Sequence, residues 1–209
     1  MSKRGILFLI GIGIVILGLS GLLVYRLFFY QTFFKTKKEV KMVDKIKDYN
    51  YVLEDRDSKL YKTNFKELKN VLSKSDIDYE AYATLLTKLY IIDFYTLDNK
   101  ISKYDVGGLD FIKESDQTNY KSMAMNTYYK NVKDNSNNKR SQKLPIVNNV
   151  KVINIEDTIY NKKDEGYLID VFWEYDKTYN AANHANVTLV KEDNKLYLVK
   201  IETIKEDTE

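Results

Sequence analysis

The sequence predicts an α+β fold in which an N-terminal transmembrane helix precedes about three helices packed on a curved four-stranded antiparallel sheet. Three observations carry this prediction: an uncharged apolar run from Gly5 to Tyr25, helical periodicity up to about residue 132, and alternating strand-like segments from residue 150 onward. Helices followed by an antiparallel sheet are the α+β order. We therefore expect a membrane anchor (1–30), a helical stalk (31–47), a globular domain (48–204) and a polar tail (205–209).

The composition excludes several classes of function. The 33 basic and 30 acidic residues are interspersed, whereas a nucleic-acid partner requires a clustered basic face. Cysteine is absent, so neither disulfides nor thiolate metal sites can form. His184 is the single histidine, in a segment that predicts a solvated loop, and one histidine cannot complete a typical zinc site. We expect no nucleic-acid partner, no metal and no cofactor.

The run from Gly5 to Tyr25 predicts a lipid-bilayer partner, because about 20 apolar residues span a membrane core. Its orientation has two interpretations. The lysines and arginines that follow the run outnumber those before it, which favours a cytoplasmic domain. Long domains, however, are translocated largely regardless of charge. We favour a single-pass plasma-membrane protein with an extracytoplasmic C-terminal domain.

Periodicity predicts the helices in order. Val40, Val43 and Ile46 recur every third residue and extend the stalk helix to residue 47, and YNYVLED predicts a short strand or an extended entry to the domain. The next helix ends at Leu72, with Asp57 or Ser58 as its N-cap. Two further helices are expected, one from Asp76 or Asp78 to about Leu97 and one from Asp116 to Val132. The third should pack through Tyr120, Met123, Ala124, Thr127 and Tyr128.

After a polar connector that ends at Pro145, the period changes to that of strands. VKVINI, GYLIDVFWEY, ANVTLV and KLYLVKIETI are rich in β-branched and aromatic residues. The last two are joined by EDN and predict an antiparallel hairpin.

Asp93 is the one candidate for chemistry, because it lies within the apolar segment LYIIDFYTL. A buried carboxylate needs partners. In a structural interpretation, which we favour, Asp93 accepts hydrogen bonds from a tyrosine or from backbone amides between Asp105 and Gly108. Gly107 and Gly108 permit backbone angles in that loop that other residues avoid. In a catalytic interpretation, Asp93 is a general base. We predict no other catalytic residue.

Aromatic residues supply the candidate binding surface. The chain has 18 tyrosines, and tyrosine is enriched at recognition surfaces. Tyr128, Tyr167, Trp173 and Tyr175 are the candidates to line such a surface. The alternative is that these rings pack as core and boundary residues of the sheet.

The order of elements resembles the nuclear transport factor 2-like, or cystatin-like, cone fold, in particular the domains of assembly proteins in type IV secretion and conjugation machines. LYKTNFKELKNVL, IIDFYTLDNKISKYDVGG and KLPIVNNVKV are similar to segments of uncharacterised single-pass membrane proteins of low-GC Gram-positive bacteria. The resemblance implies a cone-shaped domain in the cell envelope. It implies no activity, although cone-fold isomerases use an aspartate beside tyrosines.

Three hypotheses of function follow. The first is a non-catalytic module that assembles with other membrane or envelope proteins or with itself. The second is a module that binds a cell-wall glycan or a small ligand in an aromatic-lined concavity. The third is a lyase- or isomerase-like enzyme that uses Asp93.

Overall fold

A computed structural model describes residues 20–22, 24–26 and 39–204 of the chain. The chain divides into two compact units, residues 1–39 and 40–209. In the first unit, the six described residues before Glu39 are helical. The second unit contains the sheets, the helices and the hydrophobic core.

Within the described residues, no helix combines the length and the apolar character that crossing a membrane requires. The predicted fold class, which placed a transmembrane helix before the domain, is therefore corrected to an α+β domain with two antiparallel sheets. Most of the run from Gly5 to Tyr25 lies outside the described residues.

The domain begins with a hairpin, of which the sequence predicted the second strand and not the first. Strands β1 (Met42–Ile46) and β2 (Tyr51–Glu54) pair antiparallel, joined by the 3₁₀ helix η1 (Lys47–Tyr49) and by Asn50 at φ 60°. The predicted stalk helix 31–47 is therefore wrong over residues 42–46, and residues 31–38 lie outside the described part. Three apolar residues that recur at every third position do not distinguish a short helix from a twisted edge strand.

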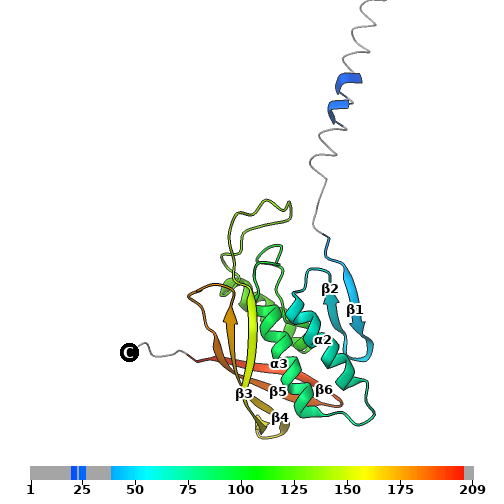
Figure 1. The fold of residues 1–209 in the computed structure, drawn as a ribbon, viewed down its shortest axis with the longest axis vertical. Helices are drawn as coiled ribbons and strands as arrows, with labels where there is room; N and C mark the ends of the chain where they lie inside the picture. Colours follow the sequence, from blue (N-terminus) through cyan, green and yellow to red (C-terminus); the bar gives the residue numbers. More distant parts are fainter. Residues whose placement is uncertain (1–19, 23, 27–38, 205–209) are drawn as a thin grey trace, which may run out of the picture. The chain divides into compact units, whose positions relative to one another are not determined.

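Two helices form the centre of the domain. Helix α2 (Lys59–Leu72) is capped by Ser58, whose hydroxyl accepts a hydrogen bond from the Tyr61 amide at 3.1 Å. Helix α3 (Tyr79–Tyr95) is capped by Asp78. Figure 1 shows α2 and α3 between the β1–β2 hairpin and β3. Both helices start within the range that the sequence predicted.

The second 3₁₀ helix, η2 (Leu109–Phe111), leads into α4 (Glu114–Asn126). This helix ends six residues before the predicted Val132, and a series of turns follows it. Its predicted packing side is also wrong in part, because Ala124 is its one buried residue and Met123 is 54% exposed.

The four-stranded sheet has the order β3-β4-β5-β6, with every neighbouring pair antiparallel. Its strands are β3 (Val147–Tyr160), β4 (Asp164–Tyr175), β5 (His184–Glu192) and β6 (Lys195–Thr203). Strands β3 and β6 form the two edges. Strand β3 has register shifts at Val147/Asn149 and Val152/Asn154, each equivalent to a β-bulge.

One core lies between the sheet and the helices. Residues Ile169, Val171 and Trp173 of β4 are fully buried, as are Leu86 and Tyr90 of α3. Helix α3 is buried on nearly all sides, which agrees with its continuous apolar sequence. The side chains that surround Asp93 are therefore held in place by packing.

Candidate functional site

Asp93, near the C-terminal end of α3, joins this helix to the loop that follows it. Its Oδ2 accepts a hydrogen bond from the Gly108 amide at 2.6 Å, and its Oδ1 pairs with the ammonium group of Lys100. The Lys100 side chain is 1% exposed and the Asp93 side chain is 22% exposed. The carboxylate therefore neutralises a cation that is almost completely withdrawn from water.

The two glycines of this loop lie where a side chain would not fit. A Cβ on Gly107 would come within 2.7 Å of both the Asp93 carboxylate and the Lys100 ammonium group. Gly108 adopts φ +76°, in the left-handed region, and a Cβ there would lie 2.9 Å from the Tyr90 ring. Close approach of the loop backbone to α3 therefore requires glycine at both positions.

A second ion-pair group holds the same loop to the segment between β2 and α2. Both guanidinium NH groups of Arg56 donate to the Asp105 carboxylate, and Nε donates to Glu54 at 2.6 Å. Asp105 also accepts from the Ile101 amide at 2.7 Å. Burial acts to raise the pKa of Asp105, but the Arg56 guanidinium outweighs it and the pKa is lowered. Asp105 is therefore held as an anion.

These groups surround a pocket of about 300 Å³, which we call the acidic pocket. Its charged lining residues are Glu54, Arg56, Asp57, Asp93, Lys100, Asp105, Asp110 and Lys121. Burial raises the pKa of Asp57 to about 6, with smaller contributions from neighbouring charges. Burial also raises the pKa of Asp110 to about 6. The pocket is therefore a place where the charge of the domain changes near neutral pH.

The acidic pocket is not arranged as a metal site. In the part of the chain that the structure describes, no three carboxylate or imidazole side chains form a group that could hold a metal ion. The carboxylates instead use backbone amides and basic side chains as partners: Asp57 accepts from the Glu54 amide at 2.7 Å, and Asp110 from the Val52 amide at 3.0 Å.

Three of the four aromatic candidates come together. The ring centroids of Tyr95 and Trp173 are 4.5 Å apart, and those of Tyr95 and Tyr128 are 5.0 Å apart. The hydroxyl groups of Tyr128 and Tyr175 lie 3.3 Å from each other. Trp173 is fully buried, while Tyr128 and Tyr175 are half-buried. The three candidates thus belong to the end of the core, with two of them at its boundary.

Tyr167, the fourth candidate, does not join this group. It pairs with Asp157 of β3 and Leu189 of β5, near the β3–β4 turn. His184, expected in a loop, is the first residue of β5, and its Nε2 lies 2.6 Å from Asp170 Oδ1.

At each edge of the four-stranded sheet, side chains bond the backbone of one residue near the start of the edge strand. At the β6 edge, the Leu196 amide donates to the Tyr82 hydroxyl at 3.2 Å, and the Leu196 carbonyl accepts from Tyr51 at 3.3 Å. These two hydroxyl groups are themselves hydrogen bonded at 2.5 Å. Tyrosine side chains from β2 and α3 therefore occupy backbone positions that an added strand would need.

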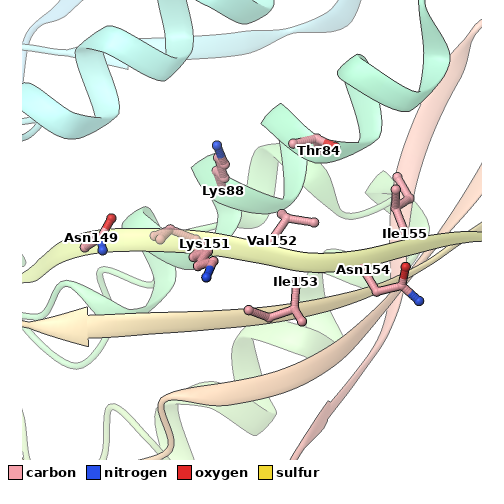
Figure 2. A pocket seen from close by; sticks show the side chains of 9 residues that line it. Thr84, Lys88, Asn149, Lys151, Val152, Ile153, Asn154 and Ile155 are labelled. Carbon is pink, nitrogen blue, oxygen red and sulfur yellow. The ribbon is translucent and has the colours of Figure 1, made fainter.

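At the β3 edge, the first residue is the one covered in this way within the described part of the chain, since the Val147 amide donates to Thr96 Oγ1 at 3.1 Å. Within residues 39–204, no strand pairs with the outer side of β3. A groove of about 590 Å³ follows this edge, lined by Thr84, Lys88 and residues 149–155. Figure 2 shows Val152 and Ile155 on the side of β3 that faces α3, and Ile153 on the other side.

Sequence reasoning missed Lys100, Arg56 and the open β3 edge. Arg56 could have been found, because arginine is rare in this lysine-rich chain and suits bidentate carboxylate pairing. Lys100 carries no such signal, since its burial depends on the fold of the loop. The edge position of β3 depends on the order of the strands, which alternation alone does not give.

These features define an α+β domain with a buried ion-pair junction and, in residues 39–204, a β3 edge that pairs with no other strand. Comparison of the chain with protein-family models, with curated proteins and with solved structures gave no match.

Proposed function

We propose that this chain is a non-catalytic interaction module of the bacterial cell envelope, whose α+β domain assembles with other envelope proteins or with itself. The observation that carries the proposal is the open edge of β3 beside the groove along α3. An exposed strand edge presents unpaired amide and carbonyl groups, and partner proteins bind such edges by adding a strand.

The exposed apolar side chains of β3 support the same proposal. Ile153 is 52% exposed and Ile159 is 58% exposed, whereas most large apolar residues of the other three strands are buried or half-buried. An added strand would cover part of both side chains. We therefore propose β3, and not the aromatic group around Trp173, as the partner surface.

The proposed location is the plasma membrane, with the domain on the extracytoplasmic side. It is supported by the uncharged sequence from Gly5 to Tyr25, which is long enough to span a bilayer core, and by the tendency of long domains to be translocated regardless of charge. A bilayer would in this case be the second partner of the chain.

The proposal is tested by site-specific photo-crosslinking in cells of the native host. A photoreactive residue is placed at Ile153 or Ile159, with exposed Glu67 on α2 as the matched control. Adducts of defined mass from the β3 positions, and none from position 67, would support assembly through this edge. Adducts from position 67 alone would contradict it.

A small-ligand function is the second candidate, because a groove of about 830 Å³ lies between α4 and β6. Tyr120 and Met123 line it from α4, and Leu198 and Ile201 line it from β6. Asn119→Trp would fill the groove. If a glycan fragment or small metabolite raises the melting temperature of the parent protein and not of this variant, the ligand function gains support over assembly.

The enzyme hypothesis ranks third. Both carboxylate oxygens of Asp93 already have donors, which suits a positioning role better than proton abstraction. The Asp93 side chain is 22% exposed and lines the acidic pocket, so water can reach its carboxylate.

A further inference from the structure

The backbone direction along β3 follows from its pairing with β4. The Trp173 amide donates to the Asn183 carbonyl, so the backbone polar groups of Trp173 point toward β5. In an antiparallel pair, directly opposite residues either both face each other or both face away. Val150, the partner of Trp173, therefore directs its amide and carbonyl groups to the open edge.

The direction of the backbone amide and carbonyl groups can be assigned in the same way along β3 and across its bulge. Alternation gives Val152 the orientation of Val150. The register shift between Val152 and Asn154 adds one residue, so the next residues directed outward are Ile155 and Asp157. The outward set 150, 152, 155 and 157 is symmetric about a point between residues 153 and 154.

Charged side chains are also distributed unevenly along this edge, with basic residues beside its first half and acidic residues in its second half. Lys151 and, on α3, Lys88 lie beside the first half of the edge. Glu156 and Asp157 follow in the second half, and both are exposed. An antiparallel strand with the same sequence would therefore bring its acidic half against the basic half of the first.

We propose that the partner of the β3 edge is the β3 edge of a second copy of this chain, related by a two-fold axis between Ile153 and Asn154. Val152 then lies opposite Ile155 of the second copy, and each pair exchanges two backbone hydrogen bonds. Lys151 lies opposite Glu156 of the second copy, at a position without backbone hydrogen bonds, where side chains approach most closely. The inference rests on the proposed function, since it names the partner of the same edge.

The bulge favours this register over others. A partner strand without a bulge could pair with β3 on one side of the bulge only, because the extra residue shifts the register on the other side. A second copy has the same extra residue opposite, so the backbone groups of both strands stay aligned before and after the bulge. Two-fold axes through Lys151, Glu156 or Asp157 would instead place each of these residues opposite its own charge, which is unfavourable. The selected axis produces two Lys151–Glu156 pairs.

The register is tested with the full chain in mild detergent, by light scattering after size exclusion and by sedimentation over a range of protein concentrations. Lys151→Glu and Glu156→Lys each replace two attractive pairs with two repulsive ones, so each variant should dimerise at least about tenfold more weakly. Lys130→Glu, at an exposed position on a different segment, is the control and should dimerise like the parent.

Mixing the two single variants gives the decisive result. In the mixed dimer, the acid introduced at position 151 of one chain faces the base introduced at position 156 of the other, and the second pair is the original Lys151–Glu156 pair. Both pairs then attract. The mixture and the double variant Lys151→Glu/Glu156→Lys should both dimerise to within about threefold of the parent. Unchanged melting temperatures would establish that the exposed substitutions leave the fold intact.

A protein that stays monomeric at every concentration, or a dimer that ignores the charge reversals, would overturn the self-pairing. Crosslinks in cells from position 153 or 159 to a different protein would then still support the broader assembly function. Loss of those crosslinks together with a monomeric protein would remove both.

Discussion

At the residue scale, Lys100 accounts for much of the importance of Asp93. An ammonium group that is 1% exposed requires a counter-charge, and Asp93 is its ion-pair partner. Asp93 also binds the Gly108 amide, so one carboxylate holds both the buried cation and the loop backbone. Removing the Asp93 carboxylate would destabilise the fold in two ways. The buried Lys100 ammonium group would lose its counter-charge, and the Gly108 amide would lose its acceptor.

We predict that Asp93→Ala lowers the free energy of unfolding by about 3–5 kcal/mol, as expected when one partner of a buried ion pair is removed. Lys100→Met in the Asp93→Ala background should recover part of that loss, because it removes the orphaned cation. Urea denaturation of both single variants and the double variant measures this cycle. Asp98→Ala, at an exposed position, is the control. Equal stability of Asp93→Ala and the parent would contradict the structural role.

Asp110 leads to a prediction about pH. Burial raises its pKa to about 6, above that of an unfolded aspartate, so the folded state binds the proton more tightly. Its contribution to stability is therefore complete below about pH 4 and is lost as pH rises through about 6. Asn at this position is neutral at every pH, and its side-chain oxygen can still accept from the Val52 amide.

Asp110→Asn should accordingly be close to the parent near pH 4 and be more stable by about 2–3 kcal/mol at pH 7.5. Urea denaturation at pH 4, 6 and 7.5 measures the difference, with exposed Asp48→Asn as the matched control. If the stabilisation is the same at all three pH values, the buried Asp110 does not titrate as described.

At the level of the elements, each edge of the four-stranded sheet has one residue whose backbone groups are bonded by side chains. The hydroxyl groups of Tyr51 and Tyr82 close the β6 edge at Leu196, and both tyrosines are fully buried. Among the residues that the structure describes, Thr96 closes the β3 edge at Val147 alone. Natural proteins protect strand edges from unwanted pairing, so an edge left open over most of its length is a feature of functional interest.

Tyr82→Phe should lower stability by about 1–3 kcal/mol, because the buried Leu196 amide then loses its acceptor. Tyr79→Phe is the control: its hydroxyl group donates to exposed Asn194 at 3.4 Å, and its loss should cost less than about 0.5 kcal/mol. Thermal and urea denaturation compare the two variants. Similar losses for both would mean that the Leu196 amide finds another acceptor, and that Tyr82 does not close the edge.

Sequence periodicity predicted the elements whose signals are local. Ser58 and Asp78 cap α2 and α3, and the four strands fall where alternation placed them. Strand β2 falls within the segment YNYVLED that predicted a short strand, whereas β1 was missed because Val40, Val43 and Ile46 recur as on one side of a helix. Boundaries such as the early end of α4 depend on tertiary contacts, which override local propensity.

In the candidate site, too, some features could be predicted from local sequence and others depend on the tertiary fold. The burial of Asp93 beside a glycine loop could be anticipated, because an acid in an apolar segment needs donors and paired glycines mark a tight loop. Its pairing with Lys100 depends on how residues 97–108 fold back on α3. The open β3 edge is a property of sheet order, set by contacts between residues far apart in sequence.

At the scale of the whole molecule, a self-paired β3 edge has a consequence for membrane location. Two copies joined through β3 would each carry their own apolar N-terminal sequence, and a dimer at a membrane therefore needs both domains on the same side of the bilayer. Attachment to a surface raises the effective concentration of the domains, so a weak edge contact can suffice there.

The side on which the domain lies is decided by protease treatment of cells from which the wall has been removed. We predict that residues 39–204 are digested while a cytoplasmic protein survives, because long domains are translocated largely regardless of their charge. Antibody detection of the domain before and after membrane lysis measures this, and digestion after lysis is the control for protease sensitivity. Protection until lysis would mean that the lysines and arginines after residue 25 hold the domain inside, and the β3 edge would then meet cytoplasmic partners.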